Sequence, residues 1–429
     1  MKLRFVAGNR IDLLNSGREY FPALLAALEL ARQEIFLEAY IFAQDATANA
    51  VVERLCAAAA RGARVQVLVD GFGARDMPED YRRRLAASGA RVLDFHRPVL
   101  WRPVRGMRRM HRKLVVIDGA AAGTGVGTAV DTPVGTTVGA ANGTGTNTGM
   151  RDSTAASART SCAFAGGINI IDDWNTPHEV PPRFDYAVRI EGPLVAQIHA
   201  AARHLWTMTA MASMRARALV RAPAMAGQPA SGGTVRAALA IRDNVLHRTE
   251  IEDAYLDAIR AARSNILMAC GYFLPSRHFF GALRGAALRG VTVTIVMQGP
   301  SDHPIMKAAT QSLYRHLLGA GIGVVEYSKS FLHAKVAVVD DHWATVGSSN
   351  IDPFSLLLSR EANVVVTDTG FARQLRASLE QAISEGGTRV TLADLARTVW
   401  YQRLAQWLAY RFARITVDLV TPNGGRNLA

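Results

Sequence analysis

The apolar positions of this chain fall into short blocks of two different periods. Runs of β-branched and aromatic residues, such as EIFLEAYIF at 34–42 and RVQVLVD at 64–70, are bounded by Gly or Asp and predict buried strands. Between them, stretches rich in Ala, Leu and Arg carry apolar residues three and four positions apart, which is typical of amphipathic helices. The alternation of the two predicts an α/β fold, with helices packed against a sheet.

The same blocks occur twice along the chain. ARGARVQVLVDG at 60–71 matches LRGVTVTIVMQG at 288–299, and LAASGARVLDF at 85–95 matches LLGAGIGVVEY at 317–327. Two copies are too few for a solenoid. They predict two pseudo-symmetric halves, each a mixed β-sheet flanked by helices, that share one active-site cleft.

The repeat also predicts the domain organisation. We expect a first half over 1–210, a linker over 211–235, a second half over 236–390, and a C-terminal basic amphipathic helix with a tail over 391–429. The first half carries an insertion at 120–158, a stretch without Leu, Ile, Phe, Tyr or Trp. A segment of Gly, Thr and Ala has no apolar side chains for a core of its own, so we expect a flexible loop there.

The candidate chemistry lies in a motif that each half contains once, H-x-K-x-x-x-x-D. Its members are His111, Lys113, Asp118, His333, Lys335 and Asp340. On a strand, residues two apart point to the same face, so the His and Lys of each motif can face one cleft. A neutral imidazole can attack phosphorus, and a charged one can donate a proton. A Lys beside it stabilises the charge on a phosphate oxygen.

More polar residues recur after each motif in the same order. Asn169 and Asn350 follow Gly-x-x and can donate to phosphate oxygens, and Asp185 and Glu361 can accept from an imidazole nitrogen and fix its tautomer. Two of the five lysines of the chain lie in the motifs. The Asp of each motif, near a turn, can be structural rather than catalytic.

With this double motif the chain resembles the phospholipase D superfamily, whose signature is the duplicated H-x-K-x-x-x-x-D. The resemblance runs from about Gly8 to Asp368, apart from the insertion. Further stretches resemble the bacterial cardiolipin synthase branch in the form that lacks N-terminal transmembrane helices. They are GNRIDLLNSG (8–17), IFLEAYIF (35–42), YFLP (272–275), SDHP (301–304) and VGSSNIDPFSL (346–356).

The resemblance implies a two-step reaction without a metal or other cofactor. One His forms a covalent phosphatidyl-histidine, and the other protonates the departing alcohol and then deprotonates the incoming one. The usual order in the superfamily makes His111 the nucleophile and His333 the acid/base, and the near-symmetry of the motifs leaves the reverse order open. The implied substrate is phosphatidylglycerol, possibly with a second phospholipid as donor, and the implied product is cardiolipin. With water as acceptor the same chemistry is hydrolysis.

The charge of the chain agrees with an anionic partner. Its 49 Lys and Arg against 36 Asp and Glu give a net charge of +13, which suits nucleic acid, an anionic membrane or a phosphorylated small molecule. The basic stretch 97–113 fits a nucleic acid or a membrane equally. The stretch 398–420 interleaves Trp, Leu and Phe with Arg, which is typical of a helix in a bilayer interface. Docking of this helix on the protein's own core is the alternative.

We therefore expect anionic phospholipid and a membrane surface as partners, and no nucleic acid. Three distant cysteines, Cys56, Cys162 and Cys270, exclude a disulfide scaffold and a Cys-based zinc cluster. The start of the chain predicts no secretory signal, and no apolar run is long enough to predict a transmembrane helix. Together with the resemblance, this predicts a peripheral protein on the cytoplasmic face of a bacterial inner membrane.

Two other functions compete with a phosphatidyltransferase. One is a phosphodiesterase of the same superfamily that hydrolyses phospholipid or nucleic acid, and the other is a binding protein without activity. The two complete motifs argue against the binding protein, and the Trp/Arg-rich C-terminal stretch favours lipid over nucleic acid.

Deletion of residues 120–158 tests whether the insertion is a tolerated loop. Because this segment offers no apolar side chains to a core, we expect the shortened chain to keep most of its activity. Turnover of the deletion variant, measured beside the full chain, checks this. A large loss of activity in a variant that still folds would make the loop functional.

Overall fold

Each half of the chain contributes a matching set of strands to one mixed sheet. The computed structural model describes residues 3–95, 109–118, 161–176, 181–213, 230, 232–244, 246–301 and 303–420. The insertion 120–158, most of the basic stretch 97–113 and most of the linker 211–235 lie outside these residues, as does the tail 421–429.

The strands of the first half are β1 (Val6–Asn15), β2 (Glu34–Ala39), β3 (Arg64–Asp70), β4 (Arg91–Phe95), β5 (Leu114–Ile117), β6 (Cys162–Gly166), β7 (Arg183–Phe184) and β8 (Tyr186–Glu191). Those of the second half are β9 (Val235–Arg242), β10 (Asn265–Cys270), β11 (Thr292–Gln298), β12 (Gly323–Tyr327), β13 (Phe331–Leu332), β14 (Lys335–Val339), β15 (Trp343–Gly347), β16 (Glu361–Thr367) and β17 (Gly387–Arg389).

The strand order repeats across a central seam. Among the described residues the main sheet runs β17-β12-β11-β10-β14-β15-β16-β9-β1-β8-β6-β5-β2-β3-β4. From the seam outward, β1-β8-β6-β5-β2-β3-β4 in one half matches β9-β16-β15-β14-β10-β11-β12 in the other, and β17 extends one edge. The outer strands β2, β3 and β4 pair in parallel, as do β10, β11 and β12, and the inner strands pair antiparallel. The predicted two-half α/β architecture is confirmed.

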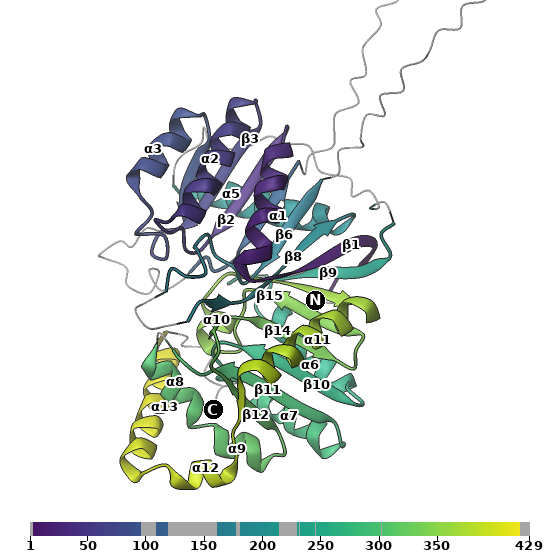
Figure 1. Cartoon of the computed structure of the whole chain (residues 1–429), viewed down its shortest axis with the longest axis vertical. Coiled ribbons are helices and arrows are strands. Elements are labelled where there is room, and N and C mark those ends of the chain that lie inside the picture. Colours follow the sequence, from purple (N-terminus) through teal and green to yellow (C-terminus); the bar gives the residue numbers. More distant parts are fainter. Residues whose placement is uncertain are drawn as a thin grey trace, which may run out of the picture.

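Helices cover both faces of the sheet. The first half has α1 (Ser16–Leu30), α2 (Ala46–Ala60), α3 (Glu79–Ala87) and α5 (Leu194–Ala212). The second half has α6 (Glu250–Ala261), α7 (Arg277–Leu288), α8 (Pro304–Gln311), α9 (Tyr314–Gly319), α10 (Pro353–Leu357) and α11 (Thr369–Gly386), followed by α12 (Leu392–Arg397) and α13 (Trp400–Val420). Figure 1 shows the two halves one above the other, with α13 beside α8 at the outer side of the second half.

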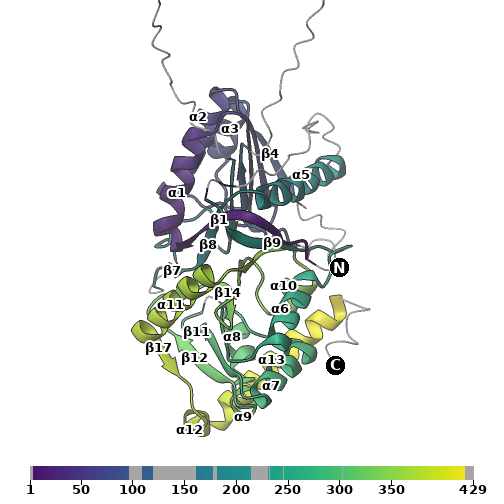
Figure 2. The same ribbon diagram turned by 90° about the vertical axis from the view of Figure 1, so that its right-hand side faces the viewer.

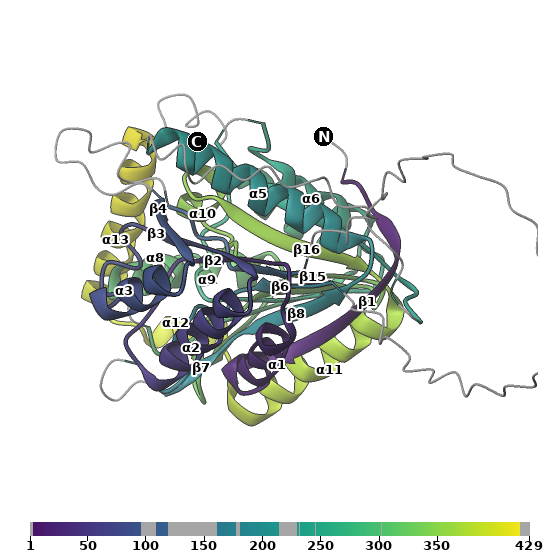
Figure 3. The same cartoon turned by 90° about the horizontal axis from the view of Figure 1, so that it is seen from above.

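The hydrophobic core of the described residues has three large clusters. One cluster lies beneath α1, α2 and α3, and another lies beneath α6, α7 and α9. A third extends through both halves, where α5 and α11 cover the sheet. Seen from the side and from above, α1 and α11 lie on one side of the strands and α5 and α6 on the other (Figures 2 and 3). The strands that these layers enclose are buried on both faces, which explains their continuous apolar runs.

Local sequence explains where the matched elements turn. Each half has a left-handed glycine between a helix and the following strand, Gly62 with φ 93° and Gly290 with φ 88°. A residue with a Cβ is strained in this conformation, so these two positions require glycine. Helix α5 ends at Ala212 and β9 begins at Val235. We retain the division of the chain at 210 and 236 as a proposal.

The two halves join where β1 pairs antiparallel with β9. Asn9 of β1 is fully buried at this seam. Its side-chain NH2 donates to the carbonyl oxygens of Val6 at 2.8 Å and Val235 at 3.1 Å, and its Oδ1 accepts from the backbone N–H of Leu194 at 2.8 Å. One side chain thus connects both seam strands to the first turn of α5. Among the described residues, no helix is long and apolar enough to cross a membrane.

Replacement of Asn9 by Ala tests the seam. The variant leaves a buried N–H and two partly buried carbonyl groups without their side-chain partner, and we expect the free energy of unfolding to fall by about 2–3 kcal/mol. Urea unfolding followed by circular dichroism measures this. The matched control is Arg10→Ala, a change at the neighbouring exposed residue, which should shift the midpoint little. Equal midpoints for both variants would contradict this role of Asn9.

Candidate active site

The two histidines of the motifs lie just before matched strands. His111 and Lys113 directly precede β5, and His333 precedes β14, which Lys335 begins. Each ring is mostly buried, with side-chain exposures of 15% for His111 and 20% for His333. His111 contacts Glu361 of the second half and His333 contacts Asp185 of the first half, so the structure brings the residues of both motifs together in one site.

Each histidine is held by a carboxylate from the other half. His111 Nδ1 lies 3.0 Å from both carboxylate oxygens of Glu361, and His333 Nδ1 lies 2.6 Å from Asp185 Oδ2. Both carboxylates are buried. A carboxylate on Nδ1 favours the tautomer with the proton on that nitrogen, which leaves the lone pair on Nε2. The sequence repeat indicated both acids, but it did not show that each acid contacts the histidine of the other half. We call this arrangement the exchange of the two acids.

Short backbone pairings between the halves cause this exchange. β7 pairs in parallel with β13, and the N–H of His333 donates to the carbonyl of Phe184 at 2.9 Å. The matching contact joins Met110 to Arg360 in a parallel bridge, and the N–H of His111 donates to the carbonyl of Arg360 at 2.9 Å. Since Asp185 directly follows Phe184 and Glu361 directly follows Arg360, each pairing places an acid beside a histidine.

The two lysines are buried and bond to their own motif. Lys113 Nζ donates to the carbonyl of His111 at 2.7 Å, and Lys335 Nζ donates to that of His333. Lys335 Nζ also lies 3.9 Å from Asp185 Oδ2. Burial lowers the pKa of Lys113 to about 7, against the opposing effect of Glu361, and burial likewise lowers the pKa of Lys335. An entering phosphate anion would favour the charged form of both.

Burial also sets the pKa values of the histidines and of Asp185. It lowers the pKa of His111, which Glu361 partly offsets. Burial and then the charge of Lys335 lower the pKa of His333 well below its usual range. Burial raises the pKa of Asp185 to about 6, although Lys335 acts in the opposite direction. Asp185 and Lys113, with pKa values of about 6 and about 7, therefore titrate near neutral pH, as groups in a proton-transferring site often do.

The two asparagines lie in matched loops, and Asn350 lines the same cavity as His111. Asn169 Oδ1 accepts from the N–H of Ile41 at 3.1 Å, and Asn350 Oδ1 lies 3.6 Å from the thiol of Cys270. With the oxygen used as acceptor, the NH2 group of each amide is oriented as a donor. The geometry is consistent with the phosphate-binding role that the sequence suggests.

The aspartates of the two motifs lie at the other end of the strands. Asp118 accepts from the backbone N–H groups of Arg32, Gln33 and Glu34 at 2.7–3.3 Å. Asp340 accepts from those of Arg263, Ser264 and Asn265 at 2.7–3.0 Å.

These contacts explain why each motif ends in Asp. Both aspartates have positive φ, 50° and 49°, which Asp tolerates better than most residues. Partial burial raises the pKa of Asp340. The hydrogen bonds from the amides of Asn265, Ser264 and Arg263 outweigh this and hold the pKa at about 2. Five residues of strand place Asp340 about 16 Å from Lys335. We therefore infer that Asp118 and Asp340 fix the turns that precede β2 and β10, and that they are structural rather than catalytic.

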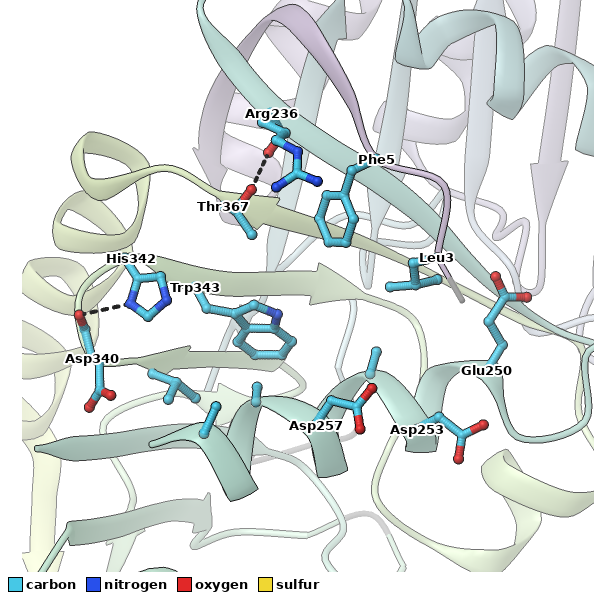
Figure 4. Close-up of a pocket in the computed structure, with 14 residues that line it drawn as sticks. Leu3, Phe5, Arg236, Glu250, Asp253, Asp257, Asp340, His342, Trp343 and Thr367 are labelled. Carbon is cyan, nitrogen blue, oxygen red and sulfur yellow. Dashed lines mark hydrogen bonds between the residues drawn. The ribbon is translucent and has the colours of Figure 1, made fainter. Parts of the chain in front are cut away.

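The Asp340 end of β14 borders a cavity of about 810 Å³ that is separate from the site of the two histidines (Figure 4). Phe5, α6, His342 and Trp343 line it, and neither motif histidine does. His342 Nδ1 lies 3.3 Å from the backbone oxygen of Asp340 there.

The structure adds residues that sequence reasoning missed. The ring of Tyr40 lies 4.8 Å from that of His111 and 5.3 Å from Lys113 Nζ. The repeat did not mark Tyr40, because the matched position in the second half is Gly271. Arg112, between His and Lys of the first motif, points to the opposite side and forms a buried bidentate ion pair with Glu38 at 2.7 and 2.8 Å.

Ser348 is a third residue of this kind, and it explains a departure in the repeat. Its hydroxyl donates to Glu361 Oε2 at 2.5 Å. The first half has Gly167 in its place, where a Cβ would lie 2.3 Å from the carboxylate of Asp185. Gly-Gly-Ile-Asn in one half and Gly-Ser-Ser-Asn in the other are therefore fitted to carboxylates of different length. The different glycine regions of the two halves were the available signal.

A cavity of about 480 Å³ opens beside His111. Polar residues line it, including Arg109, Asn350, Asp352, Ser355 and Ser359, and so do the apolar residues Ile305, Met306 and Phe412, which we call the apolar wall. Among the described residues, no group of three His, Cys, Asp or Glu side chains has the arrangement of a metal site.

Comparisons with known proteins match both halves. The family model described as "Cardiolipin synthase, PLD-like domain" matches residues 24–157 and 255–383. Cardiolipin synthase B of Escherichia coli strain K12 is 33% identical over 426 residues, covering 96% of this chain and 90% of that protein. Cardiolipin synthase A of Pseudomonas putida is 28% identical over 406 residues, covering 94% of this chain and 74% of that protein. The crystal structure of phosphatidylserine synthase from Haemophilus influenzae Rd KW20 has the same fold, with a TM-score of 0.65 at 13% identity over 98% of this chain and 96% of that one.

The fold and the matches to both halves define a phosphatidyltransferase-type enzyme of the phospholipase D superfamily. Within that superfamily, the chain belongs to the cardiolipin synthase family.

Replacement of Asp185 by Asn tests the carboxylate on His333. The change keeps an acceptor but removes the charge that stabilises the imidazolium, so we expect turnover of a chromogenic phosphodiester to fall by about 10²–10⁴. The pKa of Asp185 is about 6. In the unmodified enzyme, activity should therefore fall as the pH decreases through about 6 and the carboxylate becomes protonated.

The rate of the variant, measured against pH, should lack this acid limb. Asp340→Asn is the matched control, because it removes a carboxylate at the other end of β14 and should leave the limb in place. An Asp185 variant with an unchanged acid limb would contradict the assignment.

Proposed function

We propose that this enzyme makes cardiolipin by transferring a phosphatidyl group from one phosphatidylglycerol to a hydroxyl of another. The arrangement that carries this proposal is the pair of histidines in one site, each held through Nδ1 by a carboxylate of the other half. Two imidazoles with free Nε2 lone pairs can divide nucleophilic attack and proton transfer between them. The relatives named cardiolipin synthase supply the substrate class.

The first step forms a covalent intermediate on His111. Its Nε2 attacks phosphorus and forms an N–P bond, while the P–O bond to the glycerol headgroup breaks. His333, in its protonated form, gives its proton to the departing glycerol oxygen. The 2.6 Å contact with Asp185 supports this role, since a close carboxylate stabilises the imidazolium.

The second step reverses the proton transfer. His333, now neutral, takes the proton of a hydroxyl on a second phosphatidylglycerol, and that oxygen attacks phosphorus. The N–P bond breaks, His111 returns to its starting form, and cardiolipin leaves. Lys113, Lys335 and the amides of Asn169 and Asn350 bind the phosphate oxygens and stabilise their charge in both transition states. A second phospholipid as phosphatidyl donor uses the same steps.

The substrate and the charge of the chain also support the proposed location. A net charge of +13 attracts the protein to anionic headgroups, each basic residue near the surface contributing about 1 kcal/mol. We place the enzyme as a peripheral protein on the cytoplasmic face of a bacterial inner membrane.

Incubation of the pure protein with phosphatidylglycerol vesicles and a chelator tests the reaction. We expect cardiolipin and glycerol in equal amounts, resolved by thin-layer chromatography and mass spectrometry. Phosphatidic acid as the product would make the protein a hydrolase, and the absence of any product would reject both readings.

His111→Ala and His333→Ala should each abolish turnover, because each removes a reacting group. The control is His316→Ala, which changes an exposed histidine of α9 and should leave the rate near that of the unmodified enzyme. A base quench of the steady state, followed by peptide mass spectrometry, should find the phosphatidyl adduct on His111. An adduct on His333 would reverse the two roles.

A further inference from the structure

The last helix of the described chain shows its apolar side to the outside. α13 packs on α8 through Ala409 and Tyr410, which contact the small cluster of Leu274 and Ala309. Gln406 on the same side bonds to Gln311 of α8 at 3.4 Å. Residues advance by 100° along a helix, so positions 400, 404, 407, 408, 411 and 415 point away from this contact.

The outward side of α13 is more apolar than that of a helix docked on its own core. Trp400 is 75% exposed, Trp407 54% and Phe412 61%, and Leu404, Leu408 and Ile415 are also exposed. A surface helix of a globular protein normally turns such residues inward. A contiguous exposed apolar face marks a contact surface.

Charge decides between a lipid and a neutral partner for this face. Between Trp400 and Phe412 the helix has two arginines and no acidic residue. Arg411 lies on the outward side, with its guanidinium 5.8 Å from the ring centre of Trp407. Trp beside Arg on an apolar face suits the headgroup level of a bilayer with anionic lipids.

The same face reaches the active site. Phe412 is largely exposed and yet lines the cavity beside His111, together with Ile305, itself 56% exposed, and Met306 of α8. The cavity is thus lined by polar residues, His111 among them, and by the apolar wall, of which Phe412 and Ile305 are also exposed on the outside. A phospholipid has the same division, since its phosphate is polar and its acyl chains are apolar.

Ile305 and Met306 of the apolar wall belong to the second half of the molecule. There, β11 leads through α8 to α9, whereas in the first half β3 leads through residues 71–78 directly to α3. The histidines are nearly symmetric, but their surroundings are not.

We propose that the outward face of α13, with Ile305 of α8, is the surface that docks this enzyme on anionic bilayers, and that acyl chains enter the cavity beside His111 between α8 and α13. This rests on the proposed function for the identity of the substrate, but not for the binding itself. The arrangement lets a phosphate reach His111 while its acyl chains stay in contact with apolar groups, so the lipid does not have to leave the membrane.

The double variant Leu404→Asp/Trp407→Asp tests the docking surface. It is made in the His111→Ala background, so that binding is measured without turnover. We expect the parent to sediment with vesicles of phosphatidylglycerol and phosphatidylcholine, and the double variant to bind at least tenfold more weakly. The matched control is Leu288→Asp/Trp174→Asp, which changes an exposed Leu and an exposed Trp elsewhere and should bind like the parent. Equal urea midpoints show that all variants are folded.

Three results would overturn the docking surface. They are a parent that does not bind these vesicles, a double variant that binds as the parent does, and a parent that is dimeric in solution while the double variant is monomeric. The last result would assign the face to a second copy of the chain.

Met306→Trp tests the path of the acyl chains in the active enzyme. A larger side chain on the apolar wall should reduce turnover of long-chain phosphatidylglycerol at least fivefold more than turnover of a short-chain, micelle-free form. An equal loss for both chain lengths would reject the path. If the unmodified protein shows no turnover but vesicle binding depends on α13, the proposed function is rejected and the docking surface is kept.

Discussion

The active site depends on hydrogen bonds that cross between the two halves. Nδ1 of His111 meets Glu361, and Nδ1 of His333 meets Asp185. Neither half has a complete histidine–carboxylate pair of its own. The antiparallel pairing of β1 with β9 and the parallel pairing of β7 with β13 hold the halves in the one arrangement that completes both pairs. The seam of the sheet is therefore a requirement of the chemistry as well as of stability.

This site brings several ionisable groups out of water. Lys113, Lys335, Asp185 and Glu361 are all at least 95% buried. Burial of a charge costs several kcal/mol, and pairing offsets the cost only in part. The pKa values of both lysines are lowered because burial disfavours their charged form. A phosphodiester anion adds the negative charge that two cations favour, so the site is arranged for its substrate rather than for the stability of the fold.

Much of the fold and of the site could be predicted from the sequence, because the main blocks and the motif each occur twice along the chain. The repeat pointed to two α/β halves, and the recurrence of His, Lys, Asn and an acid in one order pointed to the site. The exchange of Asp185 and Glu361 between halves could not be predicted, since spacing along a chain does not show which strands pair. Tyr40 was missed because the repeat has Gly271 in its place. The motif left open whether Asp118 and Asp340 are catalytic or structural, and their carboxylates bind backbone amides at the far ends of β5 and β14. For α13, periodicity could show an apolar face but not the side to which it turns.

The crossed pairing can be observed directly at the imidazole nitrogens. Spectra of the protein with ¹⁵N-labelled histidine, assigned with the His111→Ala and His333→Ala variants, report the hydrogen bond at each Nδ1. The Glu361→Gln change should shift the Nδ1–H signal of His111 and leave that of His333 nearly in place. A shift at His333 with His111 unchanged would contradict the crossed pairing and the account of the site built on it.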